Sequence, residues 1–192
     1  QAVIIADSFN RRFYPLTSTS PRCLLPLANI PIIEYTLEIL ALSGVDEIYI
    51  LCCSHAVEIE KYLKHSRWKN SLFPKVSTLV AQQLHSVGDA LREIDSKQFI
   101  RGDFFLLTSG VITNMDLTLA MERHKKQRQL DKNSIMTVVL RQSNSTHRTL
   151  ARGEEALWAI DRSNKLITWE SLAPYPRKLW TILIFVHQKF QL

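Results

Sequence analysis

Apolar and polar residues follow two different spacings along the chain, and the spacings alternate. Short runs that are apolar on both faces, such as Ile48-Tyr49-Ile50-Leu51, predict strands buried on both sides of a sheet. Between them lie segments whose apolar residues recur every three or four positions, which predict helices that bury one side. The segment 31–42 is typical, and Gly44 follows it where a helix commonly ends. Strands are expected over 2–6, 47–53, 75–81, 104–107, 135–140, 156–160 and 166–169, and helices over 31–42, 56–64, 87–94 and after Asp116.

This alternation predicts an α/β fold, Rossmann-like, with a mostly parallel sheet flanked by helices. The polar residues 161–164 separate two strands and predict a hairpin. In such sheets, ligands bind beyond the carboxyl ends of the strands. The loops after Ala6 and after Leu107 both fall at that edge, so we expect any pocket to lie there. The apolar run Ile182 to Phe185 is either a core strand or an apolar surface for a partner.

Composition limits the class of protein. A chain of 192 residues and 22.2 kDa, of which 46% are hydrophobic, predicts one domain over 1–192. Three cysteines without a C-x-x-C spacing argue against a disulfide framework or a zinc site, and Cys52 and Cys53 are expected to be inert residues of a buried strand. No signal peptide or membrane-length apolar run occurs, which favours a reducing cytosol. The absence of an initiating Met predicts a piece of a longer chain.

The chain carries a net charge of +6, and basic residues gather over 123–132. An acidic partner, RNA, and a solvated helix face with cations near its C-terminus all fit this pattern. Modules that bind single-stranded RNA combine positive charge with exposed aromatic residues. Residues 123–132 contain no aromatic residue other than His124, so we expect no direct contact with nucleic acid.

Two neighbouring motifs point to a known family. They are 12–17, which read Arg-Phe-Tyr-Pro-Leu-Thr, and 21–29, which read Pro-Arg-Cys-Leu-Leu-Pro-Leu-Ala-Asn. Together they resemble the signature loop of sugar-nucleotide pyrophosphorylases, which have the nucleotide-diphospho-sugar transferase fold. The resemblance implies a glycine-rich loop that wraps a triphosphate, an Arg and a Lys that neutralise it, and a Gly-Asp pair that holds magnesium.

The chain departs from the family at each of these functional positions. Asp7-Ser8-Phe9-Asn10 stands where the family has Gly-Gly-x-Gly, Arg22 stands for the Lys, and Ser109-Gly110 stands for Gly-Asp. Glycine lets backbone N–H groups approach an anion, and a carboxylate would repel it. Neither Asp103 nor Asp116 matches the metal position. Arg12 and Arg22 either brace the loop, pair with a protein partner or retain weak anion binding. Gly88 matches a base-contacting glycine, but Asp89 replaces the Thr beside it, so 87–89 could equally begin a helix.

The resemblance therefore implies a degenerate nucleotide pocket, with no catalytic residue, no metal ligand and no cofactor. Its residues are Asp7, Ser8, Asn10, Arg12, Arg22, Gly88 and Gly110.

Within this superfamily, residues 1–170 resemble the epsilon subunits of eukaryotic translation initiation factor 2B. The motifs that carry the resemblance are 6–10, 21–29, 34–38, 52–53, 86–92 and 131–137, and the match decays after about 170. It implies a non-catalytic domain that organises subunit assembly with the gamma and other subunits and helps to dock initiation factor 2. A β-helix and the helical-repeat domain that catalyses nucleotide exchange would lie beyond these residues. An active sugar-nucleotide transferase and a basic RNA-contacting module are the alternatives.

Overall fold

The structure is a computed structural model, and it describes residues 1–7, 9, 13–140, 156–171 and 182–186. It divides into two compact units, one formed by 1–137 with 184–192 and the other by 138–183. The prediction of one domain over 1–192 stays a prediction.

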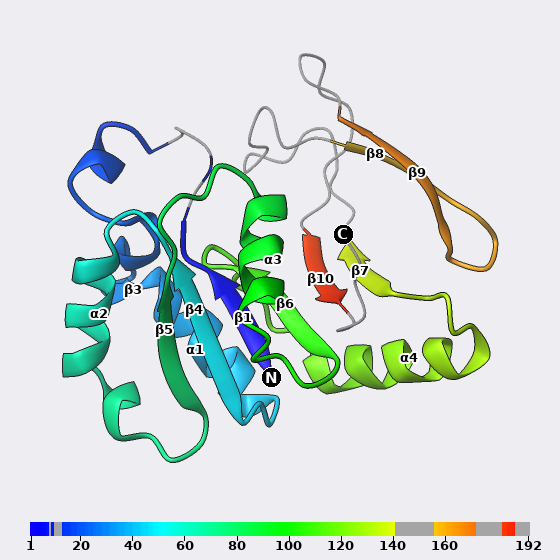
Figure 1. Cartoon of the computed structure of the whole chain (residues 1–192), viewed down its shortest axis with the longest axis horizontal. Helices are drawn as coiled ribbons and strands as arrows, with labels where there is room; N and C mark the ends of the chain where they lie inside the picture. The colour runs from blue at the N-terminus through cyan, green and yellow to red at the C-terminus, as the bar shows by residue number, and fades with distance from the viewer. Residues whose placement is uncertain (8, 10–12, 141–155, 172–181, 187–192) are drawn as a thin grey trace. The chain divides into compact units, whose positions relative to one another are not determined.

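The first unit is built on a parallel sheet (Figure 1). Its four parallel strands are β5 (Lys75–Val80), β4 (Glu47–Cys52), β1 (Ala2–Ile5) and β6 (Phe104–Thr108), in that order across the sheet. The order continues with β10 (Ile182–Val186) and β7 (Met136–Leu140), two strands that each include residues of both units, and residues 184–186 of β10 run antiparallel to β6. The mostly parallel sheet predicted from the sequence is confirmed, and the run Ile182 to Phe185 lies in one of its strands.

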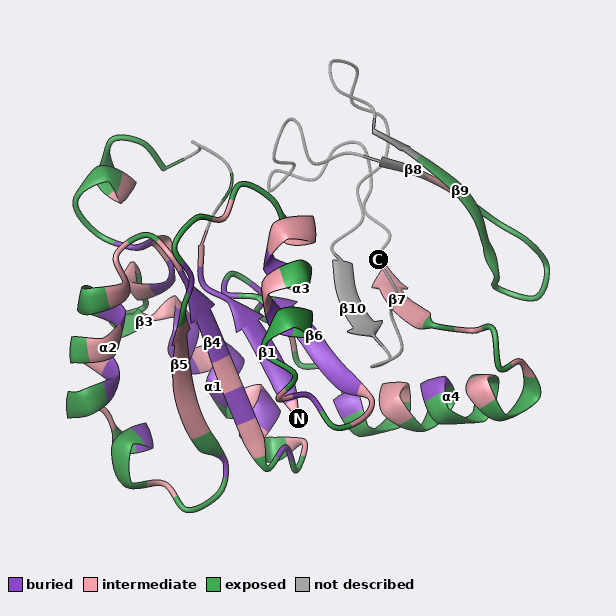
Figure 2. Cartoon of the chain, in the orientation of Figure 1, coloured by how far each residue is buried: buried purple, intermediate pink, exposed green. Residues whose placement is uncertain are grey.

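Strand β1 lies at the centre of the sheet and is buried on both faces. Its residues are at most 1% exposed, because β4 and β6 pair with it on either side. Val3 and Ile5 pack with Ala90 and Ile94 of α3 (Val87–Ser96). Since side chains alternate along a strand, Ala2 and Ile4 point to the opposite face, which α1 (Ile32–Leu42) covers. Figure 2 shows the resulting core in purple.

The predicted helices are confirmed, with shifts of one or two residues at their ends. They are α1, α2 (Ala56–His65), α3 and α4 (Leu117–Leu130). Gly44, with φ of +71°, follows the C-terminus of α1, where a left-handed conformation favours glycine. Asp116 caps α4, because its carboxylate accepts a hydrogen bond from the backbone N–H of Thr118. Among the helices that the structure describes, none has the length and apolarity of a membrane span.

Several short elements between β1 and β5 have no counterpart in the sequence-based prediction. They are the 3-10 turns η1 (Leu16–Ser18), η2 (Arg22–Leu24) and η3 (Arg67–Asn70), and the two-residue strands β2 (Pro26–Leu27) and β3 (Ile30–Pro31). Ala28 and Asn29 join β2 to β3 with φ of 49° and 67°. A two-residue strand is too short to show a hydrophobic period, so the pattern could not indicate it.

The second unit contains the predicted hairpin. Strands β8 (Ala156–Ile160) and β9 (Leu166–Ser171) are antiparallel. The Asp161 carboxylate accepts hydrogen bonds from the backbone N–H groups of Ser163 and Lys165 and so closes the turn. Trp158 and Trp169 lie opposite each other across the hairpin, with ring centroids 6.0 Å apart. The predicted hairpin is confirmed.

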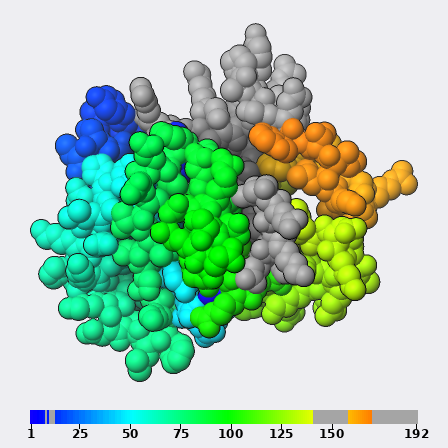
Figure 3. Space-filling view, in the orientation of Figure 1, coloured from blue at the N-terminus to red at the C-terminus, as the bar shows by residue number. Residues whose placement is uncertain are grey.

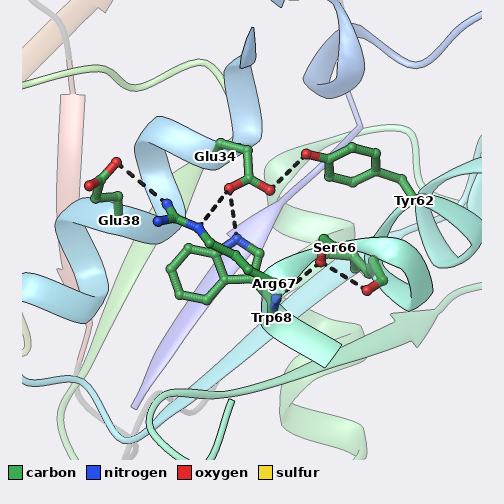
Figure 4. A network of polar contacts seen from close by, with 7 residues as sticks. Glu34, Glu38, Tyr62, Ser66, Arg67 and Trp68 are labelled. Atoms are coloured by element: carbon green, nitrogen blue, oxygen red, sulfur yellow. Dashed lines mark hydrogen bonds and ion pairs between the residues drawn. The ribbon is translucent and has the colours of Figure 1, made fainter. Parts of the chain in front are cut away.

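A buried carboxylate joins α1 to the segment after β4 (Figure 4). Glu34, only 8% exposed, accepts hydrogen bonds from the Tyr62 hydroxyl at 2.7 Å and from Trp68 Nε1 at 2.9 Å. Arg67 Nε lies 3.3 Å from the same carboxylate, and Arg67 Nη2 lies 3.5 Å from the exposed carboxylate of Glu38. Burial, followed by the bond to Glu34, raises the pKa of Tyr62. The Glu34 network therefore ties α1, α2 and η3 together.

Glu34→Ala is expected to lower the free energy of unfolding by about 2–4 kcal/mol, because it leaves the buried N–H of Trp68 and the hydroxyl of Tyr62 without their acceptor. Glu38→Ala is the matched control and should change the free energy of unfolding by less than about 1 kcal/mol, since the Glu38 carboxylate is exposed. Urea unfolding of both variants measures the difference. Equal losses for the two would show that the buried network contributes nothing beyond a surface ion pair.

Candidate functional site

The loops that follow β1, β4 and β6 meet at one edge of the sheet. These strands are parallel, and Ile5 pairs with Leu51 on one side and with Thr108 on the other. Backbone bonds continue past the strand ends, from Ala6 N–H to the Leu51 carbonyl at 2.8 Å and from Ser109 N–H to the Ile5 carbonyl at 3.0 Å. The carboxyl-end edge is where open α/β sheets bind ligands. Asp7, Cys53 and Ser109 are therefore neighbours at the position where a nucleotide pocket is expected.

Asp7 is held by backbone groups of the neighbouring loop. Its half-buried carboxylate accepts hydrogen bonds from Cys53 N–H at 2.5 Å and from Ser54 N–H at 2.9 Å. These are the first two N–H groups after β4, and an ionised acceptor makes such bonds stronger than neutral ones. The side chain that replaces the first loop glycine thus caps the end of β4.

The three cysteines lie close to this cap. Burial first, and then the Asp7 carboxylate, raise the pKa of the Cys23 and Cys52 thiols to about 12. Both are fully buried and therefore stay protonated and inert, as predicted for Cys52. Cys53 differs from the prediction of a buried strand residue, because β4 ends at Cys52 and Cys53 is half-buried. Its thiol contacts the carbonyl of Gln82 at 3.3 Å.

Ser109 joins the β6 loop to the β1 loop a second time. Its side chain is buried, and its hydroxyl donates to the Ala6 carbonyl at 3.2 Å. The glycine that the family has at this position has no hydroxyl to make that bond. Val111 continues the loop toward α1, since its carbonyl accepts a bond from the buried Thr36 hydroxyl at 3.0 Å.

Arg22 and Gly110 lie side by side. The Arg22 guanidinium carbon is 4.7 Å from the centre of the Phe13 ring, which it covers. A Cβ atom added at Gly110 would lie 3.7 Å from Arg22 Nη2. An aspartate at this position, such as the family has for magnesium, would put its carboxylate within reach of the guanidinium.

Gly88 lies at the start of α3. Ser86 caps this helix by accepting from the N–H of Asp89, and the neighbours of a Cβ added at Gly88 would be the side chains of Ser86 and Arg92. The Asp89 carboxylate accepts from Arg92 at 2.7 Å and from the backbone N–H of His85 at 3.1 Å. These two donors hold the pKa of Asp89 below its usual value. Of the two interpretations of 87–89, this geometry favours the helix start.

Asp103 and Asp116, the carboxylates near Ser109-Gly110 in the sequence, are engaged in structural contacts. Asp103 binds Arg128 Nη1 at 2.7 Å, and Asp116 caps α4. Among the residues that the structure describes, no three His, Cys, Asp or Glu side chains gather in a way that could hold a metal. The pair Ser109-Gly110 offers no carboxylate, so the donor set here does not fit magnesium. Ser8, Asn10 and Arg12 of the predicted pocket lie outside the described residues.

The structure thus brings together Asp7, Arg22 and Gly110 through the ends of β1 and β6, while Gly88 belongs to the start of α3. Sequence reasoning missed the role of Cys53 and Ser54, whose N–H groups bind Asp7. It also missed the hydroxyl of Ser109, which binds the Ala6 carbonyl. The only signal in the sequence was that polar residues follow three apolar strands.

Comparisons with known proteins agree with this fold. The profile of the nucleotidyl transferase family matches residues 1–147. The chain is 50% identical to subunit epsilon of translation initiation factor eIF2B from Schizosaccharomyces pombe, over 84% of this chain and 24% of that protein. It is 42% identical to the same subunit from Dictyostelium discoideum, over 93% of this chain and 25% of that protein. The chain therefore spans about a quarter of the length of these two relatives.

A solved structure of UDP-glucose pyrophosphorylase, complexed with UDP-glucose, superimposes with a TM-score of 0.74 over 97% of this chain and 75% of that chain. Its 14% identity shows a shared fold alone. Both resemblances stated from the sequence, in fold and to the epsilon subunits, are confirmed.

Asp7→Ala is expected to lower the free energy of unfolding by roughly 1–3 kcal/mol, because two N–H groups at the end of β4 lose a charged acceptor. Asp7→Gly, which restores the family residue, should do the same. The matched control is Asp95→Ala, at an exposed position of α3, with an expected change within about 0.5 kcal/mol. Chemical unfolding compares the three. If both Asp7 variants are as stable as the control, Asp7 is not a structural cap.

Proposed function

We propose that this chain, which belongs to the nucleotidyl transferase family, is a non-catalytic scaffold domain of a guanine-nucleotide exchange complex in translation initiation. The similarity to eIF2B epsilon subunits supports a role in translation initiation, and the altered site supports the absence of catalysis. In this proposal the domain organises subunit assembly and helps to dock initiation factor 2. Exchange of the nucleotide belongs to a helical-repeat domain outside these residues.

The observation that carries the proposal is the position of Asp7. A loop that binds a triphosphate presents free N–H groups and no negative charge. Here a carboxylate projects from the β1 loop and uses the two N–H groups that follow β4. A phosphate at this edge would meet the repulsion of that carboxylate, so the fold is retained without its anion site.

The surroundings of Gly110 support the same proposal. Catalysis of nucleotidyl transfer needs a metal to neutralise the phosphates, and the site has no carboxylate at the family position. Arg22 keeps the positive charge of the family Lys but stacks on Phe13, which favours bracing of the loop over catalysis. The proposed degenerate pocket is thus supported at Asp7, Arg22 and Gly110, while Ser8, Asn10, Arg12 and Gly88 are assigned to it from the sequence alone.

The proposed partners are the gamma subunit, the other subunits of the complex and initiation factor 2, and the proposed location is the cytosol. The support for these is the relationship to the epsilon subunits over most of the chain. Neither a membrane nor nucleic acid is a proposed partner.

The purified chain is expected to show no turnover of nucleoside triphosphates with sugar phosphates in the presence of magnesium. The physical reason is that the site provides neither a metal carboxylate nor a glycine loop. Pyrophosphate release measures the activity, and Arg22→Ala is the control. Turnover above background that disappears in Arg22→Ala would show an active transferase and contradict the proposal.

The chain is expected to co-purify with the gamma subunit at about 0.15 M salt, where exposed charges more than about 8 Å apart are screened. An interface with an apolar core keeps its affinity under these conditions, whereas binding to phosphates weakens steeply as salt rises. An RNA titration at low and moderate salt accompanies the co-purification. Tight RNA binding without capture of the subunit would replace the scaffold proposal with the RNA-contacting module.

A further inference from the structure

Helix α4 contains most of the basic residues of the segment 123–132, and one side of the helix is buried. Leu117 and His124 are fully buried, and His124 Nδ1 lies 2.7 Å from the Thr137 hydroxyl. Arg128 also turns inward and binds Asp103. These contacts fix which side of the helix faces the solvent.

The solvent side carries a regular stripe of four residues. Leu119, Arg123, Lys126 and Leu130 are all exposed, and the two leucines are 62% and 84% exposed. Their spacing of four, three and four positions places them along one face of the helix, as in the seam of a coiled coil. Figure 2 shows exposed positions along α4 in green, and Figure 3 shows this segment at the surface. We refer to these four residues as the α4 stripe, which is roughly 16 Å long at 1.5 Å per residue.

The charge of the stripe restricts what could cover it. Helix α4 contains four basic residues, Arg123, Lys125, Lys126 and Arg128, and one acidic residue, Glu122. Two cations lie at the centre of the stripe, between its leucines. A second copy of the chain would place these cations against each other, which opposes self-association.

RNA is also a poorer match than a protein. Helix α4 contains no Phe, Tyr or Trp on which a base could stack. The leucines at the two ends of the stripe offer apolar surface that phosphate contacts do not use. A helix with apolar residues at both ends and acidic residues between them would pair with all four positions.

We propose that the α4 stripe is a docking surface for an acidic helical segment of a protein partner, with its leucines in contact with Leu119 and Leu130 and its carboxylates with Arg123 and Lys126. The inference is independent of the proposed function, because it depends only on the exposed face of α4. It assigns a role to the basic run that the degenerate site leaves without one.

The test measures binding of the whole chain to a fluorescent helical peptide that carries Leu and Glu at the matching positions. Arg123→Glu/Lys126→Glu and Leu119→Ser/Leu130→Ser should each weaken binding about tenfold, as expected for the loss of two interface contacts. The matched controls change other exposed positions in the same way. They are Lys61→Glu/Lys69→Glu and Leu42→Ser/Val57→Ser, and their affinity should stay within about twofold.

Circular dichroism checks that each variant folds, and the single changes Lys126→Glu and Leu130→Ser replace any double variant that does not. A peptide that carries Ser in place of Leu should bind more weakly. Any binding of polyuridylate of similar length should be the same for the unchanged chain and for Leu119→Ser/Leu130→Ser. Equal binding of the Ser peptide, equal losses in the control variants, or tighter binding of the RNA through the same stripe would each overturn the proposal.

Discussion

The hydrogen bonds from the Cys53 and Ser54 N–H groups to the Asp7 carboxylate are the contact on which the interpretation of this site depends. They connect the end of the central strand β1 to the end of β4, at the edge where the family binds its nucleotide. One carboxylate therefore does two things. It satisfies backbone groups that would otherwise need water, and it places negative charge at the edge where a phosphate-binding loop is expected from the sequence. The Asp7 carboxylate therefore stabilises the fold and disfavours the binding of phosphate.

The scaffold around this contact does not depend on the residues of the site. Strand β1 is buried because β4 and β6 pair with it and helices cover both faces, and apolar side chains alone account for that arrangement. Ser109 and Arg22 add local contacts to Ala6 and Phe13. A family fold can therefore persist after its loop and metal positions change, because the core residues and the site residues occupy different parts of the strands and loops.

Elements with a clear hydrophobic period were predictable from the sequence, and contacts between distant residues were not. Residues 48–51 indicated a buried strand, and Asp116 indicated the start of α4, because these signals lie within a few residues of each other. Asp7 and Cys53 are 46 residues apart, and no local pattern shows that the N–H groups after β4 lack a partner. The sequence did predict that Asp7 disfavours phosphate, through its charge, but its structural role required the pairing of β1 with β4.

The most direct test follows backbone amide resonances of the isotopically labelled chain while magnesium and a nucleoside triphosphate are added to millimolar concentration. If Asp7 already occupies the N–H groups at the end of β4, the resonances of Asp7, Cys53, Ser54 and Gly110 should remain unchanged throughout the titration. Saturable shifts of these resonances, with the nucleotide and metal both required, would show that the pocket still binds its family ligand and would contradict the account.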